Sequence, residues 1–196
     1  MKPLAQLLRR KRSIRVVGFD DAPFDKTITD GPVNLSGIVC SDTRFEGMLW
    51  GTATRDGDDA TDVIAEMLLG SKFYRQVHIV LIDGITVGGF NLVDLPGLAE
   101  RLDRPCVAVM RRLPNLPGVH AALRRFADVD RRSDLVRRAG PIHQEGGFTF
   151  QVAGAPPDPV PEILARLTDR GHVPEALRIA HLVGAAVKTG ESGRRA

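Results

Sequence analysis

The hydrophobic pattern of the first third of the chain predicts three strands followed by a helix. Apolar extended segments occupy residues 13–20, 33–41 and 45–55, and short polar turns separate the last two, as in an antiparallel meander. Apolar residues then recur every three or four positions, which is the spacing of one helix face. We therefore expect a helix over residues 59–69, which Asp58 or Asp59 is suited to cap.

The middle of the chain alternates apolar strands with helices. Residues 78–82 and 106–110 are continuous apolar runs, typical of parallel strands that are covered on both faces. Helical periodicity over 91–102 and 116–126 follows these runs. The order is three strands, a helix, and then alternating strands and helices. It predicts an α/β fold in which parallel crossovers extend the meander.

The pattern weakens after residue 127. Residues 128–146 are interrupted by arginine and glycine and predict no definite element, whereas 147–153 favours one more strand. Two helices are expected, at 160–169 and 174–188, with Pro174 in the first turn of the second. Because no internal repeat is visible, we expect a basic N-terminal segment at residues 1–12 and a single domain over 13–196.

Composition adds few restrictions. With 196 residues, 43% hydrophobic and 26% charged, the chain matches one globular domain. No stretch approaches the ~20 apolar residues of a membrane span, and the N-terminal apolar run is too short for a signal peptide. Cys40 and Cys106 lie in apolar runs, which indicates buried thiols in a reducing compartment. We therefore expect a cytoplasmic protein without a membrane partner; the oligomeric state stays open.

Arginine is clustered along the chain. The net charge of +3 permits a polyanionic partner without requiring one. Guanidinium groups match phosphate geometry, although the same pairs are also compatible with a plain solvated surface. The clusters are Arg9-Arg10-Lys11-Arg12, Arg111-Arg112, Arg124-Arg125, Arg131-Arg132, Arg137-Arg138 and Arg194-Arg195.

Aspartates follow three of the predicted strands. Asp20 and Asp21 end the first strand, Asp56 follows the third, and Asp83 follows the fourth. In the predicted topology these three strand ends share one edge of the sheet, where open α/β sheets place their sites. Crowded carboxylates require a neutralising charge, and Mg²⁺ prefers such oxygen ligands. Two metal ions at such a site can clamp a phosphodiester during hydrolysis. The alternative is three unrelated turns.

Glycines accompany these aspartates. Asp-Gly occurs at 56–57 and 83–84, and Gly88-Gly89 follows. The glycines would let a nucleic-acid backbone approach closely or expose amides to a phosphate, but tight turns explain them equally well. Their spacing matches neither a Walker A loop nor a dinucleotide motif.

Several segments resemble one known family. VVGFDDAPF, TRDGDDAT, LIDGITVGGFNLVDL, PCVAVMRRLPN and PEALRIAHLVGAAVKTGESGRRA resemble the endonuclease dU family, which is similar in turn to endonuclease V. The resemblance spans residue 13 to the end of the chain. It implies a ribonuclease H-like nuclease domain with a mixed sheet flanked by helices. The implied activity is that of a metal-dependent endonuclease, with Mg²⁺ or Mn²⁺, which acts in repair on DNA containing a deaminated base, deoxyuridine above all.

The resemblance also implies roles for individual residues. Asp20, Asp56 and Asp83 match the acidic positions of endonuclease V, with Asp21 as an outer metal ligand. Arg111 stands where endonuclease V has a lysine, and it would stabilise developing charge on the phosphate. Phe24 and Phe90 are candidates to stack on an extruded base, although core packing is the alternative. The full set of candidate substrate-binding residues is Phe24, Gly84, Gly88, Gly89, Phe90, Asn91, Arg112, His172, Arg178, His181 and Arg194.

Two departures from endonuclease V concern base recognition. The proline-tyrosine wedge has no counterpart in CSDTRFEGMLWG, and residues 87–91 replace a histidine-proline-arginine segment. Recognition of the base must therefore be built differently. Two alternatives stay open: a nucleic-acid-binding module of the same fold without turnover, and a nuclease for inosine-containing or RNA substrates.

Overall fold

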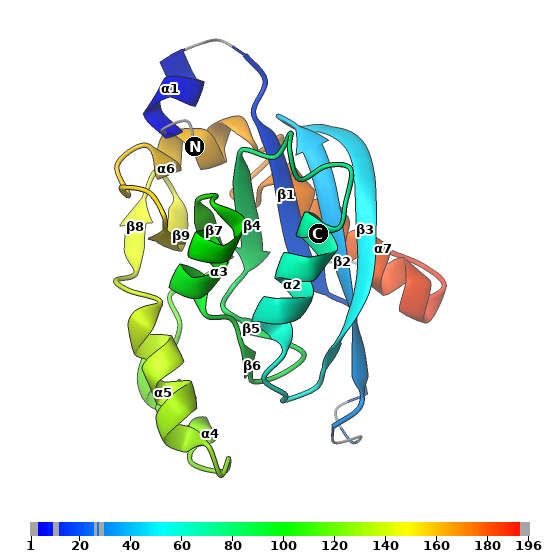
Figure 1. Ribbon diagram of the computed structural model, residues 1–196, viewed down its shortest axis with the longest axis vertical. Helices are drawn as coiled ribbons and strands as arrows, with labels where there is room; N and C mark the ends of the chain where they lie inside the picture. The colour runs from blue at the N-terminus through cyan, green and yellow to red at the C-terminus, as the bar shows by residue number, and fades with distance from the viewer. Residues whose placement is uncertain (1–3, 10–11, 26, 28–29, 193–196) are drawn as a thin grey trace.

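A computed structural model describes residues 4–9, 12–25, 27 and 30–192. Its centre is a seven-stranded sheet in the order β3-β2-β1-β4-β7-β9-β8 (Figure 1). The strands are β1 (Arg15–Asp21), β2 (Pro32–Ser41), β3 (Arg44–Thr54), β4 (Ile79–Asp83), β7 (Cys106–Met110), β8 (His143–Glu145) and β9 (Phe148–Ala153). β1, β2 and β3 form the predicted antiparallel meander. β4 pairs in parallel with both β1 and β7, which confirms the mixed sheet.

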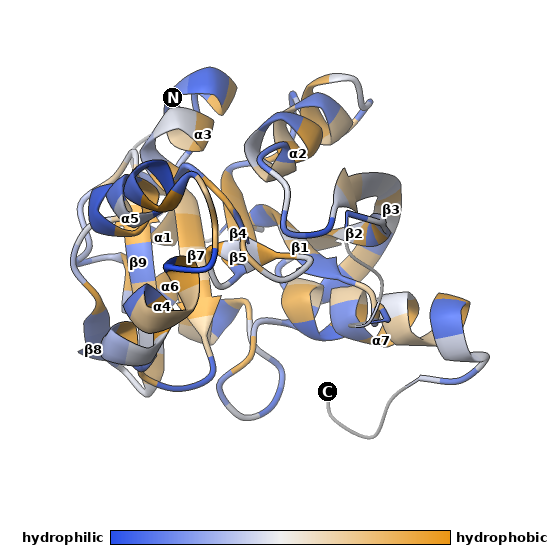
Figure 2. Ribbon diagram, turned by 90° about the horizontal axis from the view of Figure 1, so that it is seen from below, coloured by the Kyte–Doolittle hydropathy of each residue, from blue (hydrophilic) through white to orange (hydrophobic). Residues whose placement is uncertain are grey.

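Helices cover both faces of the sheet. The helices are α1 (Leu4–Arg9), α2 (Ala60–Leu69), α3 (Leu95–Leu102), α4 (Leu116–Leu123), α5 (Val129–Arg138), α6 (Val160–Arg166) and α7 (Glu175–Thr189). In Figures 1 and 2, α2 and α3 lie on one face and α7 on the other. α4 and α5 extend beyond the carboxyl ends of the parallel strands (Figure 1).

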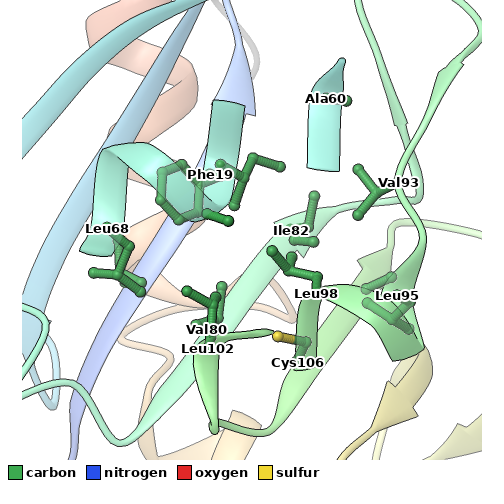
Figure 3. Packing of buried hydrophobic residues seen from close by; sticks show 14 of the residues in the cluster. Phe19, Ala60, Leu68, Val80, Ile82, Val93, Leu95, Leu98, Leu102 and Cys106 are labelled. Carbon is green, nitrogen blue, oxygen red and sulfur yellow. The ribbon is translucent and has the colours of Figure 1, made fainter. Parts of the chain in front are cut away.

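Each face of the sheet carries its own apolar core. Figure 3 shows the first, in which Phe19, Val80 and Ile82 from the strands meet Leu68 of α2 and Leu98 of α3. The alternation of side chains along each strand sends their neighbours to the opposite core, beneath α6 and α7. The helix α7 approaches β1 closely, because Gly18 has no side chain: a Cβ there would lie 2.8 Å from the carbonyl carbon of Ala176.

Several element boundaries differ from the expectation. Asn91–Leu92 forms a short strand, β6, against β5 (Thr86–Val87), so the expected helix over 91–102 begins only at Leu95. The Asp94 carboxylate fixes that start by accepting a hydrogen bond from Gly97 N at 3.2 Å. Pro174 is the N-cap of α7 and not part of its first turn.

Two stretches for which the sequence predicts no definite element contain helices or strands. The helix α1 lies in the basic N-terminal segment, and its Leu4 and Leu7 are buried in the core beneath α6 and α7. The stretch 128–146 contains α5 and β8. Cys40 and Cys106 are both buried free thiols, as expected. Within the described ranges, no helix has the length and apolar character needed to cross a membrane.

Candidate functional site

Asp20 and Asp21, the last two residues of β1, have their side chains on opposite faces of the sheet. Asp20 is 6% exposed, and its Oδ2 lies 3.0 Å from Nδ1 of His181 on α7. The Asp21 Oδ2 accepts a hydrogen bond from Gly88 N at 2.8 Å. The buried Ser36 hydroxyl donates to Ala180 O at 2.8 Å, which anchors α7 to β2 directly beside His181. The last helix is thereby fixed over the first strand, and a histidine reaches Asp20.

Asp83 stands next to Asp20 because β4 is the parallel neighbour of β1. Phe19 and Ile82 are partners in the register, so the residues that follow them, Asp20 and Asp83, lie at the same level near the carboxyl ends of the two strands. The Arg111 guanidinium, directly after β7, lies 3.8 Å from Asp83 Oδ2. The structure thus places Asp20, Asp83, Arg111 and His181 close together at the carboxyl ends of β1, β4 and β7.

The electrostatics of this edge disfavour negative charge. Burial raises the pKa of Asp20 to about 8, with further increases from the charges of Asp83 and Asp21. Burial also raises the pKa of Asp21. It raises the pKa of Asp83 as well, which the cations of Arg111 and His181 partly counteract. The pKa values of three neighbouring carboxyl groups are raised, so a bound cation would stabilise their charged forms.

Asp56 is linked to Asp21 only indirectly, because both carboxylates bind the loop 88–90. It follows β3, which β2 separates from β1, so at ~4.8 Å per strand its backbone lies about 10 Å from β1. Its Oδ1 accepts a hydrogen bond from Phe90 N at 2.8 Å, and its Oδ2 lies 3.3 Å from Arg55 Nε. Asp21 and Asp56 therefore hold the two ends of the loop 88–90 through their carboxylates.

Steric constraints favour glycine at positions 88 and 89 of that loop. Gly88 and Gly89 have φ values of +53° and +97°, which favour glycine. A Cβ on Gly89 would lie 2.5 Å from Asp56 Oδ1, so the loop can close over this carboxylate only without a side chain there. Gly84 also has a positive φ, +76°, and follows Asp83 in the turn that leaves β4.

Asn91 has a structural function in this arrangement. Its side chain is fully buried, and its Oδ1 accepts a hydrogen bond from Ala60 N, the first residue of α2, at 3.0 Å. Its Nδ2 donates to Thr54 O at 2.8 Å and to Asp59 Oδ1 at 2.6 Å. Asp59 is the N-cap residue of α2, but its carboxylate binds Thr54 and Asn91 and not the helix. Asn91 thus joins the end of β3 to the start of α2.

The remaining predicted substrate-binding residues are spread around this edge. The Phe24 ring lies 5.7 Å from the Arg55 guanidinium, beside Asp56. The Phe90 ring packs against Phe126 in a small apolar cluster beneath α4 and α5. Arg112 is exposed next to Arg111.

Two further candidates on the approach to α7 have protein partners, and one lies outside the described residues. His172 contacts Phe148 edge-on, with ring centres 5.7 Å apart. Arg178 pairs with Glu175 through two hydrogen bonds of 2.8 and 2.6 Å. Arg194 belongs to the residues that the structure does not describe.

Many of the clustered arginines are neutralised within the chain. Arg131 pairs with Asp58 and Asp128, Arg137 pairs with Asp134, and Arg138 pairs with Asp94 at 3.0 Å. Arg132 is buried. These pairs reduce the positive charge that the clusters offer to a phosphate backbone.

A pocket of about 910 Å³ lies next to the carboxyl ends of β4 and β7. Gly84, directly after Asp83, and Met110, directly before Arg111, form part of its wall. Leu92, Val119 and Val136 add apolar surface, and α4 and α5 enclose the far side. The sequence pattern gave no indication of this pocket, because it forms between the sheet edge and a helix in the stretch 128–146.

The donor chemistry at this edge fits a hard divalent cation. Carboxylate oxygens are the ligands that Mg²⁺ and Mn²⁺ take in proteins, and the buried Asp20 lies beside two further carboxyl groups, Asp21 and Asp83. Across the described residues, no three His, Cys, Asp or Glu side chains are already drawn together around a single metal position. Binding would therefore require the carboxylates to turn toward a common point.

The mixed sheet order and the acidic edge define a protein of ribonuclease H-like fold. It shares this fold with endonuclease V of Ciona intestinalis, solved in complex with a 24mer DNA containing an inosine followed by a ribo-adenosine. That match has a TM-score of 0.53 and 13% identity, and it covers 87% of this chain and 84% of that one.

Residues 12–188 match the family described as Endonuclease dU, and the chain belongs to this family. A relative from Methanothermobacter thermautotrophicus, named UPF0215 protein, is 38% identical over 186 residues, covering 93% of this chain and 91% of that protein. The crystal structure of an Archaeoglobus fulgidus protein is 34% identical, with a TM-score of 0.83, and covers 89% of this chain and 98% of that one. The expected resemblance is confirmed.

Proposed function

We propose that this chain is a metal-dependent endonuclease that hydrolyses a DNA phosphodiester near a deaminated base, with deoxyuridine as the base. Membership of the Endonuclease dU family supports the activity. The fold is also that of an endonuclease V solved with inosine-containing DNA. The observation that carries the proposal is the group formed by Asp20, Asp21 and Asp83, whose pKa values are raised by burial, beside the cation of Arg111.

The carboxylates are the proposed metal ligands. Asp20 and Asp83 would hold Mg²⁺ or Mn²⁺, with Asp21 and Asp56 completing the site. Such a cation lowers the pKa of an attacking water and neutralises charge on the phosphate oxygens. His181 fixes the orientation of Asp20 through the 3.0 Å contact between Nδ1 and Oδ2.

Arg111 is the proposed contact to the reacting phosphate. In the hydrolysis, a water oxygen bonds to phosphorus, the ester bond to the next nucleotide breaks, and the departing oxygen takes up a proton. Negative charge grows on the non-bridging oxygens as the water approaches. The Arg111 side chain is 39% exposed and lies 3.8 Å from Asp83, so it can bind a phosphate held at the carboxylates.

The apolar pocket beside Gly84 is the proposed place for the base. A base extruded from the helix next to the reacting phosphate would meet this opening, and apolar walls suit its flat faces. The Phe90 ring is partly buried and packs against Phe126. The pocket walls are therefore the proposed surface for stacking.

Cleavage of oligonucleotides with a single altered base tests the proposal. The substrates are labelled DNA, single- and double-stranded, with one deoxyuridine, one deoxyinosine or no altered base, and a matching RNA. Each is incubated with EDTA, Mg²⁺ or Mn²⁺. We expect cleavage near deoxyuridine only with metal. Retention of the DNA in a gel shift without cleavage under any condition would contradict the proposal and favour a binding module.

A further inference from the structure

A buried guanidinium lies behind the Asp56 turn. Arg132, on α5, is 5% exposed, although its helix contains four arginines. Its Nε donates to Asp128 Oδ1 at 2.7 Å, its Nη2 donates to Asp56 O at 2.8 Å, and its Nη1 donates to Phe90 O. Its Cζ lies 4.2 Å from the centre of the Phe126 ring. The group therefore contacts the protein on each of its nitrogen atoms and on one face.

The two carbonyls that Arg132 binds belong to residues that also bind each other. The Asp56 carboxylate accepts from Phe90 N at 2.8 Å, and Asp56 N donates to Gly88 O at 2.9 Å. Arg132 completes this arrangement by donating hydrogen bonds to the carbonyl oxygens of both residues. The turn after β3 and the loop 88–90 are thus joined to α5 through one side chain.

The backbone of Asp56 is in a less favourable conformation. Its φ is +52°, in the left-handed region, which aspartate tolerates better than most residues but at some cost in free energy. A lysine could not replace the arginine, since only the planar fork presents donors to two carbonyls and a carboxylate at once. Arg132 cannot itself touch a substrate, because it is buried.

We propose that Arg132 is a positioning residue that holds Asp56, together with the loop 88–90, in the place that cleavage requires. The part of this inference that concerns cleavage rests on the proposed function. The part that concerns Asp56 rests on the contacts alone. The experiment separates the two.

The test compares Arg132→Met with Arg131→Met. Arg131 is the adjacent residue on α5, 46% exposed, and also pairs with Asp128, so its replacement controls for lost charge on this helix. Amide hydrogen exchange of the metal-free protein is measured at Asp56 and Phe90 and, for reference, in the middle of β4. In Arg132→Met we expect exchange about tenfold faster at Asp56 and Phe90 and unchanged in β4. Arg131→Met should match the parent at all of these amides.

Kinetics on the cleaved substrate complete the test. In Arg132→Met, kcat should fall about 10- to 100-fold, as for a group that orients a metal ligand. KM should stay unchanged, and Arg132→Lys, which keeps the charge without the fork, should recover only part of the loss. If Arg132→Met does not fold, the same measurements on Arg132→Lys decide the question.

Each outcome has a distinct meaning. Equal exchange at Asp56 and Phe90 in the two methionine variants would overturn the inference, whether or not the parent cleaves DNA. Faster exchange with an unchanged kcat would show that the loop has no part in cleavage and would overturn its functional half. A parent that cleaves no substrate would refute the proposed function, while the exchange data would still decide whether Arg132 holds Asp56.

Discussion

His181 Nδ1 lies 3.0 Å from Asp20 Oδ2, across a separation of 161 residues in the chain. The contact joins the last helix to the end of the first strand through one oxygen of the Asp20 carboxylate. The same imidazole lies close enough to Asp83 to lower the pKa of that carboxyl when it is charged. His181 therefore influences both carboxylates at the centre of the site.

Replacement of His181 should impair cleavage without unfolding the protein. We expect His181→Ala to lower activity about 10- to 100-fold, the usual effect of removing a group that orients a metal ligand. His181→Asn, whose amide can stand near the position of Nδ1, should restore part of the activity. His143→Ala is the matched control, because that residue lies on β8, stacks on Phe150 with ring centres 5.2 Å apart and should leave the rate within about twofold. Equal rates for the two alanine variants would contradict the assignment.

The stability of the metal-free protein should fall as the pH rises. The pKa of Asp20 is raised from 3.8 to about 8 in the folded state, so the folded state holds this proton more tightly than the unfolded state. Stability is therefore lost progressively between about pH 4 and pH 8. Asp20→Asn removes this titration. In EDTA, the melting temperature of the variant should exceed that of the parent, and the difference should be several degrees larger at pH 8 than at pH 5. A difference in melting temperature that becomes smaller as the pH rises would contradict the raised pKa of Asp20.

Arg111 and Arg112 should differ in their effect on cleavage although they are adjacent and both exposed. Only Arg111 is paired with Asp83, at 3.8 Å, so Arg111→Ala should slow cleavage roughly 10²- to 10³-fold, the scale of one lost transition-state donor. Arg112→Ala should weaken DNA binding slightly and leave kcat unchanged. The comparison is made by single-turnover cleavage at saturating enzyme. Equal single-turnover rates for the two variants would show that Arg111 is ordinary surface charge.

Asn91 should be essential for stability and not for substrate binding. Its side chain links Ala60 N, Thr54 O and Asp59, so Asn91→Ala leaves buried polar groups without partners. We expect the free energy of unfolding in urea to fall by about 2–3 kcal/mol. Asn34→Ala, which loses only a 3.4 Å hydrogen bond to Thr52, should cost less than about 0.5 kcal/mol. A small effect of Asn91→Ala would reopen its prediction as a substrate-binding residue.

The meeting of Asp20 with Asp83 could be predicted because it follows from strand order alone. Both residues end apolar runs, and a parallel crossover makes those runs neighbours. The distance of Asp56 could not be predicted so well. The intervening β2 sets it apart, and contact with the site depends on the loop 88–90, whose path the local pattern does not reveal.

Arg132 and Asn91 show where local pattern fails. Arg132 lies in a charged stretch, and its burial depends on two carbonyls and an aromatic ring from distant segments. Asn91 is one of the predicted substrate-binding residues, but its side chain is buried and binds three partners from distant segments. The later start of α3 could be predicted from two residues. Asp94 is a typical N-cap residue, and Pro96 suits the first turn of a helix.

The carboxylates are the central part of the proposed site, and Asp83→Asn tests them directly. Asparagine removes a metal ligand and relieves repulsion at Asp20, so the metal-free variant should melt no lower than the metal-free parent. Mg²⁺ or Mn²⁺ should raise the melting temperature of the parent, and the variant should lose most of that rise.

The decisive measurement is the cleavage rate of a duplex with one deoxyuridine, at saturating Mg²⁺ or Mn²⁺, for the parent and for Asp83→Asn. We predict metal-dependent cleavage by the parent and none detectable for the folded variant. Normal cleavage by Asp83→Asn would contradict this prediction.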